Sequence, residues 1–212
     1  MIKLSFRRLG ALAIALGITA CGGPIVHDLV PLPGMEDSVP EITTVTNIVF
    51  ETTAGQIGIA VYPEAAPNAA QRFTELVESG YYDGTPIFRI VPGFVAQFGV
   101  NWRDPHIAWR ERNFDDDPTI FALDPGTLAF AKAGPNTNST QVFINYGQNN
   151  QLAGDNFTTF GKIVSGLEFI ESFVAVGDPS MGLDQGRLWS DGGAYLDSLE
   201  TKPTMIESAK VE

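Results

Sequence analysis

The residues best suited to chemistry are one arginine and two glutamines placed inside strongly apolar segments. Arg89 and Gln97 share the run FRIVPGFVAQFG, and Gln141 and Phe143 share the run QVFIN. The period-two alternation of a strand puts Gln141 and Phe143 on one face. A guanidinium stays protonated at any physiological pH, so an arginine in such a setting is a permanent hydrogen-bond donor. Taken alone, however, an arginine is more often a surface residue in an ion pair.

The sequence lacks the usual patterns of other catalytic classes. It has no GxSxG nucleophile elbow, no Walker loop and no GxGxxG fingerprint. The single cysteine, Cys21, cannot form an internal disulfide, and the two histidines, His27 and His106, are far apart. The acidic run at residues 115–117 lacks the spacing of a calcium loop, so a solvated loop is favoured over a metal site. We therefore expect neither a metal nor a cofactor.

Composition and charge narrow the class of protein further. The 212 residues include 13 Lys and Arg against 25 Asp and Glu, which gives a net charge of −12. Such a chain repels phosphate backbones, and the sequence has no strong basic patch, so we expect no nucleic-acid partner. The 22 Gly and 14 Pro favour many turns and a β-rich or mixed fold over a helical bundle.

The N-terminal residues predict export. A basic stretch, KLSFRR, precedes the apolar run LGALAIALGITA, which is too short to span a bilayer as a helix but fits a signal peptide. The following ITACG resembles a bacterial lipobox, in which Cys21 is lipidated and becomes the new N-terminus. The alternative is an ordinary signal peptide with an incidental cysteine. We expect residues 1–20 to be a lipoprotein signal peptide and the proline-rich residues 21–46 to be a flexible tether.

The remaining residues, 47–212, form one predicted domain of short strands. Strands are predicted at residues 48–53, 56–62, 86–91, 94–98, 126–131, 140–146, 157–163 and 205–211. The first two are joined as a hairpin at Ala54 and Gly55, and the last can return to pair with the first. Helices are predicted from about residue 68 to Gly80 and through residues 167–173. Short strands with two helices and no βαβ rhythm indicate a closed antiparallel barrel capped by helices.

Several segments, in order along the chain, resemble the cyclophilin family of peptidyl-prolyl cis-trans isomerases. These are PEAAPNAAQRFTELVESGYYDG, FRIVPGFVAQFG, AKAGPNTNSTQVFI and FGKI, and the resemblance spans about residues 48–211. Several blocks in the right order are more specific than a lone motif. The resemblance implies a mostly β fold, a closed eight-stranded antiparallel barrel with a helix over each end.

The resemblance also implies roles for individual residues. Arg89 would be the catalytic arginine, with Gln97 and Gln141 as polar groups beside it. The proline pocket would be lined by Phe94, Val95, Phe143, Leu152 and Phe157. The backbone at Ala131, Lys132 and Ala133 would hydrogen-bond an extended substrate chain.

Four residues depart from the family's pattern. Phe88 replaces the histidine that usually precedes the arginine, and Val95 replaces a common methionine. Lys132 stands where asparagine is typical, and Phe157 fills a position often held by His or Tyr. None of these changes removes the arginine or the apolar floor of the predicted proline pocket. We therefore expect them to affect peptide preference rather than activity.

Together, the resemblance and the N-terminal sequence predict an isomerase that accelerates rotation about X-Pro bonds in folding envelope proteins. Its partners would be proline-containing unfolded or folding polypeptides, and a lipid on Cys21 would attach it to the outer membrane, facing the periplasm. No bond breaks in this reaction, so no cofactor is required, and we expect a monomer. The rival interpretations are a non-catalytic proline-peptide-binding chaperone and a scaffold lipoprotein.

Overall fold

The N-terminal hairpin of the domain forms where the sequence predicts it. Strand β1 (Thr46–Thr52) pairs with β2 (Gly55–Val61) through a turn in which the Thr52 hydroxyl accepts hydrogen bonds from the backbone N–H groups of Ala54 and Gly55. Gly55 has a φ of 142°, a conformation that favours glycine. The alternating apolar residues of both strands can therefore face the same interior.

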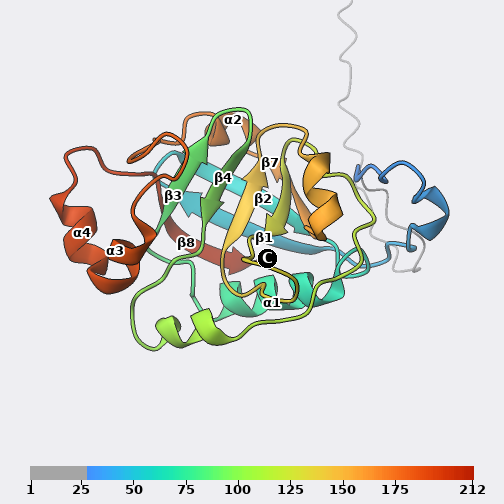
Figure 1. Cartoon of the computed structure of the whole chain (residues 1–212), viewed down its shortest axis with the longest axis horizontal. Coiled ribbons are helices and arrows are strands. Elements are labelled where there is room, and N and C mark those ends of the chain that lie inside the picture. The colour runs from blue at the N-terminus through green and yellow to red at the C-terminus, as the bar shows by residue number, and fades with distance from the viewer. Residues whose placement is uncertain (1–27) are drawn as a thin grey trace, which may run out of the picture.

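Eight antiparallel strands close into a barrel in this computed structural model, which describes residues 28–212 (Figure 1). The other strands are β3 (Thr85–Val91), β4 (Val95–Phe98), β5 (Thr127–Phe130), β6 (Val142–Asn145), β7 (Gly161–Ser165) and β8 (Met205–Val211). Their order around the barrel is β1-β2-β7-β5-β6-β4-β3-β8. β8 closes the barrel because it pairs with both β1 and β3. The expected eight-stranded antiparallel barrel is confirmed.

Apolar side chains fill the barrel, and helix α1 (Pro67–Glu78) covers one end of it (Figure 1). Phe73 on the buried face of α1 packs against Phe50 and Phe160 from the barrel wall, with ring centroids 6.0 and 5.0 Å apart. Helix α2 (Leu167–Ile170) lies at the opposite end. A helix at each end agrees with the expectation, although α2 is a single turn.

Two predicted boundaries are wrong by three or more residues. β7 begins at Gly161 rather than at residue 157, because the hydroxyls of Thr158 and Thr159 donate to the carbonyl oxygens of Asp117 and Ala122 and divert the preceding residues from strand pairing. The helix predicted through residue 173 ends at Ile170. The Ser172 hydroxyl instead donates to the Phe169 carbonyl oxygen, a local bond that competes with continued helix.

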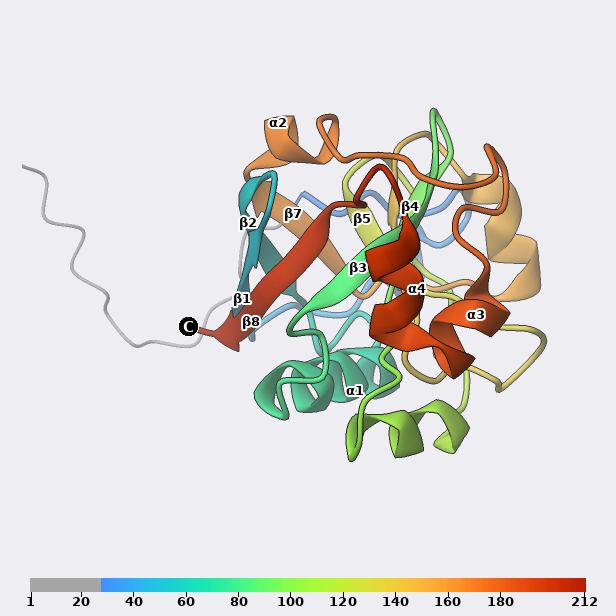
Figure 2. The same ribbon diagram turned by 90° about the vertical axis from the view of Figure 1, so that its left-hand side faces the viewer.

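Two further helices, α3 (Gln185–Ser190) and α4 (Gly192–Ser198), were not expected from the sequence. Both lie beside β3 on one side of the barrel (Figures 1 and 2). They enclose a small second core that includes Phe88 of β3 together with Leu183, Leu188, Tyr195 and Leu196. Short helices with few apolar residues carry little periodicity, which is why the sequence pattern did not reveal them. Three short 3-10 helices complete the described elements, at Glu36–Ser38, His106–Glu111 and Asn150–Asp155.

Residues 28–46 pack against the barrel, in contrast to the flexible tether expected over residues 21–46. Leu29 and Ile42 are 5% and 2% exposed and contact Tyr62 and Phe121 in a separate apolar cluster. The backbone N–H of Leu32 donates to Ile120, and that of Ala122 donates to Val30. The folded domain therefore includes this segment. A proline-rich segment without hydrophobic periodicity can still pack when a few of its apolar side chains contact apolar residues of the domain.

Several N-terminal predictions lie outside the described residues. They concern the signal peptide at residues 1–20, the lipidated Cys21, the first part of the tether and His27. Within residues 28–212, no helix is both long enough and apolar enough to cross a membrane.

Candidate active site

The polar residues singled out from the sequence meet on the outer face of the barrel. Strand register places Arg89 of β3 opposite Gln97 of β4, and Gln97 opposite Phe143 of β6. Arg89 Nη1 donates to Gln97 Oε1 at 3.1 Å, and Gln97 Nε2 donates to Gln141 Oε1 at 2.7 Å. Because an arginine can only donate, it fixes the orientation of both amides along this chain. The predicted grouping of Arg89, Gln97 and Gln141 is therefore present in the structure.

A β-bulge puts the arginine on this outer face. Ile87 pairs with Phe98 but Arg89 pairs with Gln97, so Phe88 is an extra residue in β3. Ile87 and Ile90 both point into the barrel core, and the two residues between them both lie outside. Bulges often occur beside active sites because they redirect a side chain. Strict alternation along the sequence gives no sign of this one.

An apolar cluster adjoins the arginine. It is made of Phe94, Val95, Leu123, Ala129, Ala131, Phe143, Leu152, Ala153 and Phe157. The Arg89 guanidinium lies 5.8 Å from the centre of the Phe94 ring, and the Phe143 and Phe157 rings meet edge to face at 5.8 Å. All five residues predicted to line the proline pocket belong to this cluster. A flat, rigid ring the size of proline suits such a surface.

Four residues at this cluster were not predicted from the sequence. Leu123 and Ala129 are fully buried members of it, and Ala153 is a partly buried one. Asn149, 3% exposed, donates from Nδ2 to the Phe94 carbonyl oxygen and so fixes the strand end that carries the Phe94 ring. The sequence shows only an asparagine in the loop between two predicted strands, and its burial becomes visible in the structure.

The segment predicted to bind the substrate backbone is partly engaged already. The backbone N–H of Ala131 donates to the Gln141 carbonyl oxygen, and that of Ala133 donates to Thr137 Oγ1. Among the described residues, the Lys132 N–H and the carbonyl oxygens of residues 131–133 are then the groups left for a peptide. A cavity of about 690 Å³ lies along this segment and extends past Gln141.

The Lys132 side chain turns away from this cavity into a loop contact. Its ammonium lies 2.7 Å from the Asp116 carboxylate, and the two side chains are 2% and 10% exposed. Burial opposes ionisation of Asp116, but hydrogen bonds from Lys132 and Asn138 lower the pKa of its carboxyl below the usual value. Asp117 is also buried, at 5% exposure. The solvated loop expected at residues 115–117 is therefore wrong for two of its three acids, because each is held by donors that the sequence pattern does not show.

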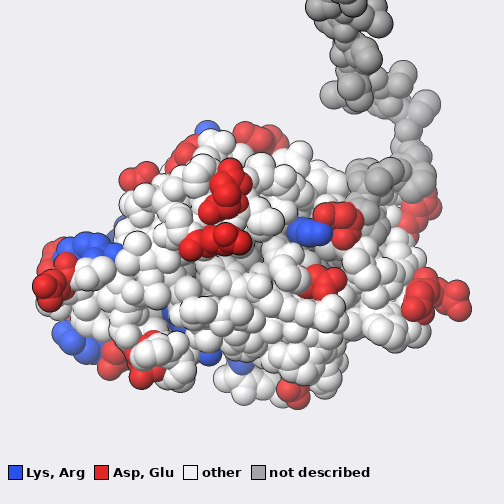
Figure 3. All heavy atoms as spheres, turned by 90° about the horizontal axis from the view of Figure 1, so that it is seen from above, with Lys and Arg blue, Asp and Glu red and all other residues white. Residues whose placement is uncertain are grey.

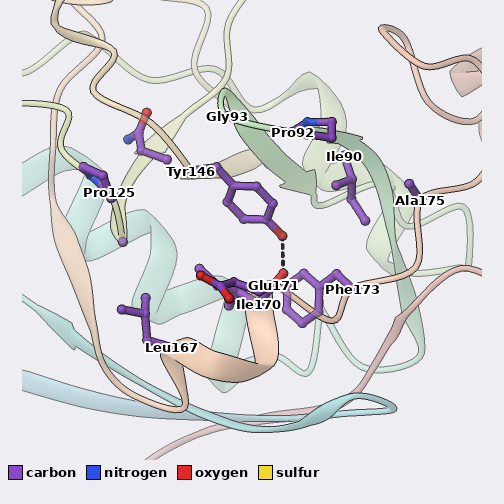
Figure 4. A pocket seen from close by; sticks show the side chains of 12 residues that line it. Ile90, Pro92, Gly93, Pro125, Tyr146, Leu167, Ile170, Glu171, Phe173 and Ala175 are labelled. Atoms are coloured by element: carbon purple, nitrogen blue, oxygen red, sulfur yellow. Dashed lines mark hydrogen bonds between the residues drawn. The ribbon is translucent and has the colours of Figure 1, made fainter.

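A second pocket lies at the α2 end of the barrel and is separate from the arginine. Figure 4 shows its lining, in which Tyr146, Ile90 and Phe173 converge and the Tyr146 hydroxyl donates to the Ile170 carbonyl oxygen. The cavity measures about 410 Å³ and includes none of the polar residues described above. Figure 3 shows the face that carries α2, where acidic side chains gather among mostly uncharged ones. The residues predicted for catalysis and substrate binding therefore lie outside this pocket.

The remaining candidate ligands do not form a metal site. Within residues 28–212, no group of three or more His, Cys, Asp or Glu side chains could hold a metal ion. His106 packs edge to face against Tyr81, with ring centroids 5.8 Å apart. It lies on the 3-10 helix His106–Glu111 and is absent from the polar chain at Arg89.

Comparison with known proteins identifies the family. The sequence model described as "Cyclophilin type peptidyl-prolyl cis-trans isomerase/CLD" matches residues 47–184. The chain is 39% identical over 134 residues to peptidyl-prolyl cis-trans isomerase-like 1 of Gibberella zeae, covering 59% of this chain and 80% of that protein. It is 40% identical over 129 residues to peptidyl-prolyl cis-trans isomerase ppi1 of Schizosaccharomyces pombe, covering 57% and 80%. The chain belongs to the cyclophilin-type peptidyl-prolyl cis-trans isomerase family.

Solved structures agree on the fold. A crystal structure of a cyclophilin-type peptidyl-prolyl cis-trans isomerase from Cryptosporidium parvum superposes with a TM-score of 0.62 at 23% sequence identity. The match covers 80% of this chain and 98% of the Cryptosporidium chain. The fold and the sequence relatives together define an enzyme of the cyclophilin type.

Proposed function

We propose that Arg89 accelerates X-Pro rotation by donating a hydrogen bond to the prolyl nitrogen. The peptide bond resists rotation with a barrier of ~18–20 kcal/mol, because nitrogen shares its lone pair with the carbonyl. In the twisted state the nitrogen regains that lone pair and becomes an acceptor. A guanidinium beside it stabilises this state more than the planar one, which is the requirement for catalysis.

The observation that carries this proposal is the placement of Arg89 beside the apolar cluster that contains Phe94. Its Nη1 is bonded to Gln97 and its Nε to the Ser180 carbonyl oxygen at 2.7 Å. Within the described chain Nη2 makes no hydrogen bond, so a donor remains for the substrate. The pocket would hold the proline ring while the preceding carbonyl swings. Its low dielectric strengthens the donated bond.

The test is a peptide isomerisation assay on the wild type, Arg89→Ala and Arg89→Lys. One aimed donor is worth roughly 3–4 kcal/mol in related transition states, so Arg89→Ala should lower kcat/KM by about two to three orders of magnitude. Arg112→Ala, at an exposed arginine outside the pocket, is the matched control and should retain full activity. Equal rates for the wild type and Arg89→Ala would refute the arginine mechanism. The fold neighbour from Cryptosporidium was also solved in the presence of the dipeptide Ala-Pro, so an Ala-Pro peptide is a suitable first substrate.

We propose further that the enzyme is exported and lipid-anchored through Cys21, and that it acts as a monomer on proline-containing unfolded or folding polypeptides of the envelope. The support is the sequence of residues 3–22 alone, with its basic start, apolar run and ITACG. The relatives named above come from fungi, and their names carry no indication of export. An outer-membrane position facing the periplasm follows if the anchor is present.

Fatty-acid labelling tests the anchor directly. Wild-type protein should incorporate the label, and Cys21→Ser, which keeps the size of the side chain but removes the thiol, should not. Label that persists in Cys21→Ser, or no label in the wild type, would overturn the lipid assignment and leave the isomerase mechanism untouched.

A further inference from the structure

The segment from Gly177 to Leu199, here called the α3–α4 segment, contacts β3, the strand that carries Arg89, from outside the barrel. Figures 1 and 2 both show α3 and α4 beside β3. The match to the family's sequence model ends at residue 184, directly before α3. The helices of this segment therefore follow the region that the family's sequence model matches.

One end of the segment binds Arg89 through its backbone. Asp178 and Gly182 exchange two backbone hydrogen bonds, and the Asp178 carboxylate accepts from the Ser180 and Met181 N–H groups, which closes a tight loop. The Ser180 carbonyl oxygen at the tip of this loop accepts from Arg89 Nε at 2.7 Å. The Arg89 guanidinium is therefore hydrogen-bonded both to this loop and to Gln97.

The same loop approaches the strand so closely that its position is fixed. Gly182 has a φ of 72°, and a Cβ there would collide with the Phe88 carbonyl oxygen and the Arg89 Cα. The next residue, Leu183, donates its N–H to the Phe88 carbonyl oxygen at 2.8 Å. Phe88, the residue that replaces the family's usual histidine, is 1% exposed in the core that it shares with α3 and α4. The Phe88 side chain therefore packs the α3–α4 segment against β3.

The other end of the polar chain meets Gln185, the first residue of α3. Gln141 Nε2 donates to Gln185 Oε1 at 3.2 Å. The direction follows from Arg89: Gln97 must turn its oxygen to the arginine, so its amide nitrogen faces Gln141, whose own amide nitrogen then faces Gln185. Gln185 supplies the acceptor that this arrangement requires. Both ends of the chain Arg89–Gln97–Gln141 are thus held by the α3–α4 segment.

The placement of Gln185 is itself well determined. Asp184 caps α3, with its carboxylate accepting from the Arg187 N–H at 3.0 Å, and its own N–H donates to the Tyr195 hydroxyl. Gln185 lines the cavity of about 690 Å³ together with Trp189, whose ring lies 4.6 Å from the Arg110 guanidinium. A side chain in this position can act on the amide network without entering the proline pocket.

We propose that Gln185 is a positioning residue of the isomerase, which orients the Arg89 donor through Gln141 and Gln97. The proposal rests on the proposed role of Arg89. Arg89 sets the direction of both amides, and the Gln185 acceptor then holds Gln141, and through it Gln97 and the Arg89 donor, in place. Without this acceptor, Gln141 can rotate its amide, and Arg89 loses part of its alignment. The loss falls on the twisted state, where the arginine acts, and not on binding of the planar peptide.

The variants Gln185→Met and Gln185→Glu separate this role from packing. Methionine keeps the length of the side chain but removes the acceptor, whereas glutamate keeps the acceptor. We expect kcat of Gln185→Met to fall about fivefold with KM unchanged, which is the loss of one ordinary hydrogen bond, and Gln185→Glu to stay within about twofold of the wild type. Gln71→Met, at an exposed glutamine of α1 that donates to Glu75 at 2.8 Å, is the matched control and should change neither constant. Melting temperatures are measured in parallel.

A double variant completes the test. If Gln185 acts only through the arginine, Gln185→Met should cause no further loss in an Arg89→Ala background. Wild-type kcat in Gln185→Met, equal losses in the Met and Glu variants, or a change confined to KM would each overturn the positioning role while leaving Arg89 as the catalytic residue. Full activity in Arg89→Ala would instead overturn the proposed mechanism, and the role of Gln185 with it.

Discussion

At the residue scale, the buried pair of Lys132 and Asp116 ties three loops together beside the groove. The Lys132 ammonium also donates to the Asn156 carbonyl oxygen at 3.0 Å and lies 5.2 Å from the centre of the Phe157 ring. Asp116 accepts in addition from Asn138 at 2.7 Å. Lys132 therefore shapes the groove wall and offers little charge to a peptide, since its side chain is 2% exposed.

Lys132→Met should lower the free energy of unfolding by about 3 kcal/mol, because it leaves the Asp116 carboxylate buried without its cation. Urea unfolding measures this loss. The matched control is Lys162→Met: Lys162 pairs with Asp28, whose side chain is 65% exposed, so its loss should cost below about 1 kcal/mol. Equal costs for the two variants would show that burial does not strengthen the Lys132 pair.

At the element scale, α1 begins with a cap that comes from a distant loop. The N-cap residue Ala66 has no side chain that can accept, and Pro67 follows it. The Asp117 carboxylate instead accepts from the N–H groups of Asn68 and Ala69, at 3.1 and 2.9 Å. These two donors would otherwise be unpaired at the start of the helix.

Asp117→Ala should lower the free energy of unfolding by about 1–2 kcal/mol, the usual cost of losing a helix cap. Asp117→Asn keeps one acceptor and should cost less. The neighbouring Asp115→Ala, at an exposed position, is the control and should lie within about 0.5 kcal/mol of the wild type. A cost for Asp115→Ala as large as that for Asp117→Ala would mean that general loop charge, not capping, matters.

The pH dependence of the same variants follows from the pKa of Asp117. Burial raises this pKa above 3.8, against the lowering effect of the two backbone donors. A raised carboxyl pKa means that ionisation disfavours the folded state, so the wild type should lose stability relative to Asp117→Asn as the pH rises from 3.8 through the folded-state pKa. Thermal unfolding of both proteins across this range measures the difference. A difference that does not change with pH would contradict it.

The sequence predicts elements whose information is local and misses those that depend on distant partners. Period-two alternation was enough to place the strands and to put Gln141 and Phe143 on one face. The bulge at Phe88 adds one residue to a strand without changing its apolar character, so no pattern marks it. The cap from Asp117 and the acceptor from Gln185 lie 48 and 44 residues from the groups they bind, and only the folded chain shows them.

At the scale of the whole molecule, the described chain begins close to the predicted lipid. Residues 28–46 are packed on the barrel, and six residues, 22–27, separate Cys21 from Asp28. Even fully extended, the stretch from Cys21 to Asp28 spans at most about 25 Å. If the anchor is present, the domain is held near the membrane surface and cannot extend as far as the expected tether of residues 21–46 would allow. With such an anchor, the packing of residues 28–46 would set how far from the membrane the isomerase can work.

Two truncations test whether residues 28–46 belong to the folded domain. A chain starting at residue 28 keeps the apolar cluster and should unfold at the same temperature as the full-length protein. A chain starting at residue 47 loses Leu29 and Ile42, which are almost fully buried, and uncovers Tyr62 and Phe121. Two such side chains contribute about 4 kcal/mol by burial, so the melting temperature should fall by about 10 °C, as measured by circular dichroism.

In the chain starting at residue 28, the double variant Leu29→Ala/Ile42→Ala should reproduce most of this fall, because it removes the same side chains and keeps the backbone. Equal melting temperatures for the two truncated chains would instead mean that the barrel is complete without this segment, and that residues 28–46 act as a tether after all.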